Sequence, residues 1–230
     1  MGQLTWKTDD KPAWYPSTIS ALDAYLGTLI IAGTPFPDEK VTPLKKNLAY
    51  NLQYIQFLDR VIKDIKLSSV LLTQNIKSFS VHSAAVIEGV FNYIVISQGY
   101  GTTTEWKSYK KLKNDRYEIN GTVLLHETEV SIKITPPVLT EMTFDQMSKK
   151  VESKKLLGNV GDLYAAISRI RKLRNKIHIH GFESSTDTDY HSFSKSEYDL
   201  ARRVLYGVLT SPLFEKSPYP KIFEYLKEND

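Results

Sequence analysis

The sequence predicts a mainly α-helical protein with a small antiparallel β-hairpin or sheet inserted between its helices. Two observations predict this fold class. Apolar residues recur every three or four positions through several long segments, which is the spacing of one face of an α-helix. Between Thr102 and Leu139 the pattern changes to a two-residue alternation, as in "EVSIKI", which is typical of a β-strand. We therefore expect a helical bundle that is interrupted once by β-structure.

Three helices are expected before the β-structure. The first should begin at a cap formed by Ser17 or Thr18 and run to about Ala32, where "GTPFP" stops it. Thr42-Pro43 suits the start of the second, because threonine caps a helix and proline fits its first turn. The third should cover residues 68–97, beginning at a serine cap and ending before a glycine.

The β-structure is expected to be a hairpin or a three-stranded sheet. Its turn is placed at the polar stretch "HETE", residues 126–129, and Pro136-Pro137 should end the last strand. The Asn-Gly pair at Asn120 marks a bend. In "EWKSYKKLKNDR", Trp106 and Tyr109 alternate with lysines, which fits a solvated strand edge better than a surface that stacks nucleic-acid bases.

Helices resume after the prolines. We expect them to begin at Thr143 or Asp145, to continue over residues 159–179 and from 194 or 196 to 210, and to end with a short helix over 220–227. Residues 181–194 are polar and are expected to form a loop.

The predicted organisation has three parts. Residues 1–67 form an N-terminal extension with two helices packed on the core, residues 68–210 form the main helical domain with its β insertion at about 102–139, and residues 211–230 form a C-terminal short helix.

Composition excludes several classes of function. The 230 residues contain no cysteine, so a disulfide framework, a thiolate zinc site and a cysteine nucleophile are excluded. A net charge of +4 permits a polyanionic partner without requiring one. The first residues, "MGQLTWKTDDKPAWYP", lack the apolar core of a secretory signal, and the longest apolar runs are shorter than the ~20 residues of a membrane span. We expect a cytoplasmic protein with no membrane partner.

The segment "RIRKLRNKIHIHG" places charged residues where apolar ones are expected. On a helix over residues 160–179, Arg174 lies one turn beyond Ile170 on the apolar arc, and His178 lies one turn beyond Arg174. Arg171 lies at the edge of the arc beside Tyr164, where a long side chain can reach water. Lys172 and Lys176 point away from the arc and are expected to be solvated.

Three interpretations of these residues compete. Arg174 and His178 could be structural and pair with a buried acid such as Glu88. His178 and His180, together with His191, could bind a metal, but on a helix the first two diverge by about 200°. Alternatively, the arginine could hold a phosphate while a histidine transfers protons near neutral pH.

The stretch "LRNKIHIHG" resembles the signature of the HEPN superfamily, in which four to six residues separate an arginine, often followed by a polar residue, from a histidine. Arg174, Asn175 and His180 match this signature, and Arg171 with His178 also satisfies its spacing. An earlier segment, "HSAAVIEGVFNYIVI", is similar to the first core helix of such domains and carries Glu88 in apolar surroundings. The resemblance covers residues 68–210.

The resemblance implies a fold and a function. HEPN domains are helical bundles that commonly dimerise and bring two Arg/His helix ends into one cleft. Many are metal-independent ribonucleases of toxin–antitoxin or antiviral defence systems, which form a 2′,3′-cyclic phosphate. The implied catalytic residues are Arg174, Asn175, His180 and His178, supported by Glu88 and Arg171. The implied partners are RNA, a second copy of the chain, and an antitoxin or another defence protein, and no cofactor or metal is expected.

Some HEPN domains are inactive and serve as binding modules. An inactive interaction module is therefore the second function expected for this chain. A metal-dependent enzyme that uses the histidines ranks third.

Overall fold

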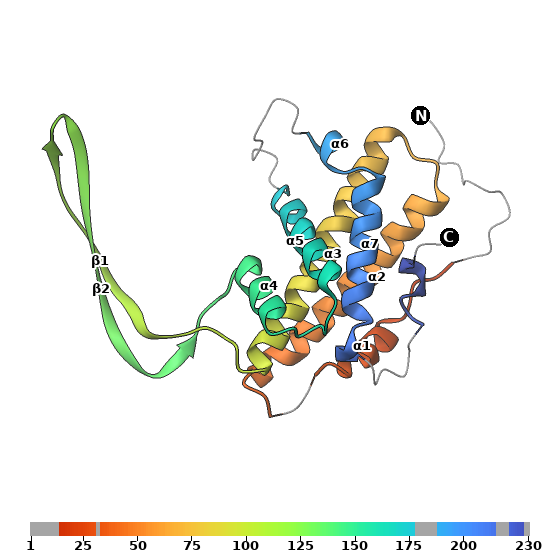
Figure 1. The fold of residues 1–230 in the computed structure, drawn as a ribbon, viewed down its shortest axis with the longest axis horizontal. Coiled ribbons are helices and arrows are strands. Elements are labelled where there is room, and N and C mark those ends of the chain that lie inside the picture. Colours follow the sequence, from red (N-terminus) through yellow and green to blue (C-terminus); the bar gives the residue numbers. More distant parts are fainter. Residues whose placement is uncertain (1–13, 31–32, 178–187, 215–220, 228–230) are drawn as a thin grey trace. The chain divides into compact units, whose positions relative to one another are not determined.

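The structure is a computed structural model that describes residues 14–30, 33–177, 188–214 and 221–227. The fold is mainly α-helical with one antiparallel β insertion, as the sequence predicts (Figure 1). The chain divides into a helical unit, Met1–Gly99 with Thr143–Asp230, and a β unit, Tyr100–Met142. The β insertion is thus a separate unit rather than an addition to the helical core.

The helical unit begins with α1 (Ile19–Gly27), α2 (Asp38–Asp64) and α3 (Ser69–Ser97). Thr18 caps α1 by accepting a hydrogen bond from the backbone N–H of Ala21, which confirms one of the two predicted caps. The expected end of this helix at Ala32 is wrong, since the α-helix stops at Gly27. The bounds of α3 agree with the prediction, and Ser68 is its N-cap.

The predicted start of α2 at Thr42-Pro43 is wrong. The helix begins at Asp38, directly after Pro37, and Pro43 lies inside it. Asp38 and Glu39 supply negative charge to the first turn, where the helix dipole favours it. Pro43 cannot donate the backbone hydrogen bond of its position, so α2 tolerates one lost bond near its N-terminus.

After the β insertion, the described part of the helical unit continues with four α-helices. Their bounds are α4 (Phe144–Ser153), α5 (Gly161–Asn175), α6 (Asp189–Ser192) and α7 (Lys195–Leu209). Thr143 and Ser194, each one of two predicted start positions, cap α4 and α7 with capping boxes. The short helix α6 lies in a region that was expected to be a loop.

The C-terminal helix is shorter than predicted. Two 3₁₀ turns, η1 (Pro212–Phe214) and η2 (Glu224–Leu226), are the helical structure described beyond α7.

The core of the helical unit is built around α3, which contacts α2, α4, α5, α6 and α7. Phe79, Val90 and Phe91 are completely buried along it. Because the apolar residues of α3 occupy most of its circumference, it is the one described helix long and apolar enough to cross a membrane. In the structure, 61% of its apolar 18-residue stretch is buried inside the protein.

The β unit is a single long hairpin of β1 (Thr103–Ile119) and β2 (Thr122–Leu139). The turn predicted at residues 126–129 is wrong, because the chain reverses at Asn120-Gly121. Both turn residues have positive φ, 51° and 76°, which Asn-Gly adopts readily and which matches the twist of paired strands. β2 also continues through Pro136-Pro137, where the prediction ended it. The hairpin is closed at its base, where the Thr140 N–H donates to the Thr102 carbonyl at 2.8 Å.

Candidate functional site

The C-terminal end of α5 carries the residues singled out in the sequence. Its apolar arc packs inside the helical unit, since Tyr164, Ala166, Ile167 and Ile170 are buried. The helix ends at Asn175, four residues earlier than predicted, and a tight turn follows in which the Ile177 N–H donates to the Arg174 carbonyl at 3.2 Å. His178 and His180 lie outside the described residues.

Arg174 pairs with Glu88 of α3. The Arg174 Nη2 donates to Glu88 Oε2 at 3.2 Å, so the contact suggested by the two apolar patterns is present. The position is not buried as expected, because 42% of the Arg174 side chain and 26% of the Glu88 side chain remain exposed. Glu88 therefore holds the guanidinium at a surface that solvent and a ligand can reach.

Arg171 has a different environment from Arg174. Its guanidinium forms an ion pair with Asp145 in the first turn of α4, and the side chain is 23% exposed. Asp145 also pairs with Lys149 at 2.8 Å. The expectation that Arg171 reaches into water beside Tyr164 is wrong, because α4 supplies an acid. Arg171 thus joins α5 to α4, whereas Arg174 and the exposed Asn175 lie at the helix end.

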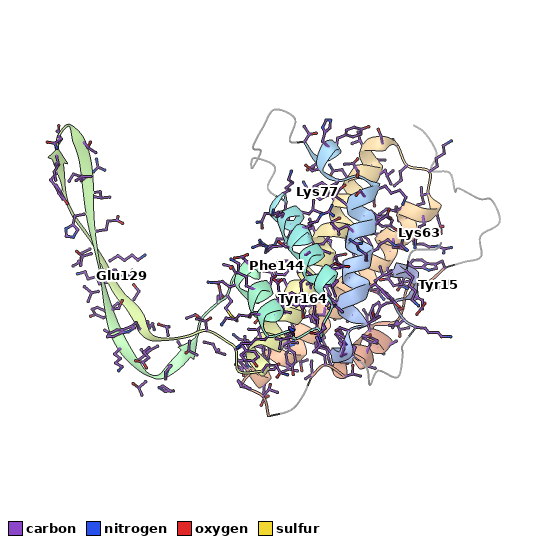
Figure 2. All side chains as sticks on the ribbon, viewed as in Figure 1. Tyr15, Lys63, Lys77, Glu129, Phe144 and Tyr164 are labelled. Carbon is purple, nitrogen blue, oxygen red and sulfur yellow. The ribbon has the colours of Figure 1, made fainter. Side chains whose placement is uncertain are left out.

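The chain returns to the same end of the helical unit after the segment that carries His178 and His180. Lys176, which was expected to be solvated, donates to Ser192 Oγ of α6 at 2.9 Å. Lys77 of α3 pairs with Asp189 of α6 at 2.8 Å. These contacts fix α6 against α3 and the end of α5 (Figure 2 labels Lys77). Lys176, which contacts α6, lies two residues after Arg174 in the sequence.

Two other histidines, His191 and His82, make contacts within the helical unit. His191 is exposed, and its Nδ1 lies 2.8 Å from the Thr188 hydroxyl. His82 Nδ1 lies 2.7 Å from Asn51 Oδ1, and its ring meets the edge of Tyr54. Burial lowers the pKa of His82 from its ordinary value of 6.5. Within the described parts of the chain, no group of histidines and acids is arranged to hold a metal ion.

Sequence reasoning missed a buried polar cluster between α2 and α7. Asp59, 3% exposed, accepts a 2.6 Å hydrogen bond from the Tyr198 hydroxyl and lies 2.9 Å from Lys63 Nζ and 3.5 Å from Arg202 Nε. Arg202 also donates to the Tyr225 carbonyl at 3.0 Å. Burial and the nearby Asp59 carboxylate raise the pKa of both Tyr198 and Tyr225. The sequence contained a signal for this cluster, because Asp59 is an acid on the otherwise apolar face of α2.

A groove lies between α5 and α7 in the same unit. Its volume is about 750 Å³, and its lining includes Leu163, Ala166, Arg203, Tyr206 and Gly207. Leu163 packs closely on Gly207, because a Cβ at this position would lie 3.0 Å from the end of the leucine side chain. The groove is lined by one cation, Arg203, and one acid, Asp162, without a histidine, so Arg174 and its neighbours remain the better candidate for chemistry.

Comparisons with family models, with curated proteins and with solved structures find no match to this chain. The candidate site therefore rests on its residues and their geometry.

Proposed function

We propose that the chain is a metal-independent endoribonuclease of the HEPN type that acts in toxin–antitoxin or antiviral defence. The observation that carries the proposal is the Arg174–Glu88 pair, which is partly exposed at the end of α5, with five residues between Arg174 and His180. An exposed ion pair of this kind contributes at most about 1 kcal/mol to stability, so stability alone is a weak reason for it. A held and accessible guanidinium suits the binding of phosphate.

The proposed reaction divides the work among three side chains. His180 takes the proton of a ribose 2′-hydroxyl, which attacks the adjacent phosphorus and displaces the 5′-oxygen of the next nucleotide. The products are a 2′,3′-cyclic phosphate and a 5′-hydroxyl, with the proton returned to the leaving oxygen. Arg174 neutralises the charge that develops on the phosphate, and Asn175 orients the substrate or the histidine.

We further propose that the protein is a homodimer. The apolar arc of α5 is filled by the helices of its own unit, so it does not supply the dimer contact. An exposed row on α2 provides another surface, because Tyr50, Tyr54 and Phe57 are 53%, 42% and 47% exposed. Such a contiguous aromatic row favours a protein contact.

The decisive experiment is RNA cleavage in EDTA with analysis of the product ends. We expect cyclic-phosphate and 5′-hydroxyl ends from the wild-type protein. His180→Ala should lower the rate by about 10²–10⁴, as loss of a general acid–base does. Adding Arg174→Ala should lower it little further, because groups that act as a unit are not additive.

Two control measurements complete this design. His178→Ala tests the choice of histidine. A loss of cleavage rate equal to that of His180→Ala would mean that His178 is the acid–base group or that both histidines share this role. Circular dichroism of each variant excludes unfolding as the cause. Varied RNAs left intact, or products with 3′-hydroxyl ends, would reject the ribonuclease.

The second function is an inactive interaction module. The specific observation that favours it is the hairpin, which exposes many large apolar side chains. Intact RNA together with a stable complex of defined composition would favour this function.

A further inference from the structure

A second cavity lies between α5 and α7, next to the groove described above. Its volume is about 390 Å³, and Arg203 lines both the cavity and the groove. We call it the arginine cavity. α5 and α7 pack against each other (Figure 1), so its lining converges from two helices. The lining residues are Arg169, Lys195, Ser196, Asp199, Leu200 and Arg203.

The arginine cavity has more cations than acids. Lys195 pairs with Asp199 at 2.5 Å, so the one acid among the described lining residues already has a cation as its partner. Arg169 and Arg203, both exposed, are the two remaining charges. Like charges that share a concave space repel each other, and low-dielectric walls strengthen this repulsion. A bound anion removes that cost.

These two arginines differ from the others of the helical unit. In the described parts of the chain, no acid pairs with Arg169 or Arg203. The arginines without an acid are thus the two that line one cavity. The other four each form an ion pair with a carboxylate: Arg60, Arg171, Arg174 and Arg202.

The chemistry of the two cavities indicates a ligand with two parts. Guanidinium groups bind phosphate through paired hydrogen bonds, and two of them match the charge of roughly −1.5 to −2 on a phosphate monoester. The groove, at about 750 Å³, has the size of a small-molecule site and is lined by apolar side chains and by Tyr206. Asn159 and Asp162 add oxygens that can accept hydrogen bonds from ring amino groups. A phosphate joined to a base fits both parts.

We propose that the arginine cavity and the groove together bind a nucleotide, with its phosphate between Arg169 and Arg203 and its base in the groove. The nucleotide is either free or one unit of a single RNA strand, because both sources present the same phosphate and base. The proposal does not depend on the ribonuclease, since neither arginine takes part in the proposed cleavage.

Arg203→Ala and Lys46→Ala provide a matched test, because each removes one positive charge. Lys46 is exposed on α2 and lines neither cavity. In calorimetric titration of the full chain with AMP, Arg203→Ala should raise the dissociation constant by about tenfold or more, since it removes charge-assisted hydrogen bonds. Lys46→Ala should change it by less than about twofold, because solvent and salt screen a distant charge.

Arg169→Ala should behave as Arg203→Ala does, because both guanidinium groups hold the same phosphate. Circular dichroism of each variant excludes unfolding as the cause. Equal effects of Arg203→Ala and Lys46→Ala would reject the proposal, and so would a wild-type protein that binds neither AMP nor RNA.

Thr210→Trp tests the place of the base. Thr210 is exposed and lines the groove, so an indole ring there occupies the groove while both arginines remain. This variant should bind AMP about tenfold more weakly and should bind inorganic phosphate as the wild type does. Unchanged binding of AMP would overturn the assignment of the groove to the base.

A 2′-O-methyl RNA oligonucleotide identifies the source of the nucleotide, because it lacks the hydroxyl that the proposed cleavage uses. If the site serves a strand, the oligonucleotide binds more tightly than AMP, and Arg203→Ala lowers the salt dependence of log Kd by about one unit. If the site serves a free nucleotide, AMP binds more tightly. A variant Arg203→Ala that cleaves RNA but no longer binds AMP would confirm this site as separate from the ribonuclease. Binding of both ligands that is unaffected by Arg203→Ala would overturn the proposal.

Discussion

Arg171 and Arg174 lie about one turn apart on α5, and each is paired with an acid from a different helix. Asp145 holds Arg171 and Glu88 holds Arg174. Both pairs join two helices, but the Arg174 side chain is 42% exposed against 23% for Arg171, and Arg174 lies four residues before His178 in the sequence. This difference separates a structural arginine from the arginine proposed to bind phosphate.

The two acids therefore form a matched pair for mutation. Glu88→Gln should lower the rate of RNA cleavage, because the amide holds the Arg174 guanidinium less firmly at the proposed phosphate position. Asp145→Asn should leave the rate near that of the wild type, although it also removes an arginine's partner. Both changes should alter the unfolding free energy by about 1 kcal/mol or less, since both pairs are partly exposed. A single-turnover assay measures the cleavage rate, and urea denaturation measures the unfolding free energy. Equal cleavage rates for the two variants would assign Glu88 a purely structural role.

His82 gives a pH dependence that does not involve the candidate site. Asn51 Nδ2 donates to the Asn47 carbonyl at 2.8 Å, so Asn51 Oδ1 faces His82 and accepts from its Nδ1. Burial lowers the pKa of His82 below 6.5, so the unfolded chain binds a proton more readily than the folded one. The contribution of His82 to stability is present above about pH 6.5 and falls as the pH drops through the lower, folded-state pKa.

Thermal unfolding at about pH 8 and about pH 5 tests this dependence. His82→Gln should reduce the loss of stability between the two values, because glutamine does not titrate. His191→Gln is the control, since His191 is exposed. If His82→Gln and the wild type show the same difference in Tm between the two pH values, other groups cause the loss of stability in acid.

At the scale of elements, several boundaries followed from local chemistry. Ser68, Thr143 and Ser194 marked the starts of α3, α4 and α7, and the side chains of the last two cap their helices. The start of α2 was placed too late because Thr42-Pro43 is a good start signal, yet Pro37 followed by two acids is another. Two adequate signals cannot be ranked without the packing that selects one of them.

The hairpin turn was a choice between two local signals. The polar stretch at 126–129 suited a loop, but Asn120-Gly121 meets a steric requirement, positive φ at both positions, that few residues satisfy. The Arg174–Glu88 contact could be predicted because both residues interrupt apolar patterns. The Arg171–Asp145 contact could not, since it depends on how α4 packs against α5.

Pro43 should limit the stability of α2. Pro43→Ala restores a backbone donor inside the helix and removes the clash of the ring with the preceding turn. We expect the unfolding free energy to rise by about 1 kcal/mol or more, after allowing for the greater freedom of the unfolded chain. Lys46→Ala, at another exposed position of α2, should change it by less than about 0.5 kcal/mol. Urea denaturation measures both, and a destabilised Pro43→Ala would mean that the proline ring packs favourably.

At the scale of the whole molecule, the cluster around Asp59 joins α2, α7 and the C-terminal turn. Arg202 contacts both Asp59 and the Tyr225 carbonyl, so one buried cation connects three segments that are distant in sequence. Such a cluster is costly to build, and breaking it is costly as well.

Asp59→Ala should lower the unfolding free energy by about 3–5 kcal/mol, because it leaves Arg202 buried without its acid. Asp23→Ala breaks the exposed pair with Lys45 and should cost about 1 kcal/mol or less. Urea denaturation followed by circular dichroism compares the two. Equal losses would mean that water replaces the missing carboxylate at Arg202.

The hydrogen bond between Thr140 and Thr102 at the base of the hairpin affects how the chain folds. α3 and α4 pack together although the whole β unit separates them in sequence. A long connection raises the entropy cost of bringing its ends together. A hairpin that forms first from its local Asn-Gly turn converts that long connection into a short one before α4 docks. The insertion should therefore slow the folding of the helical unit less than its length suggests.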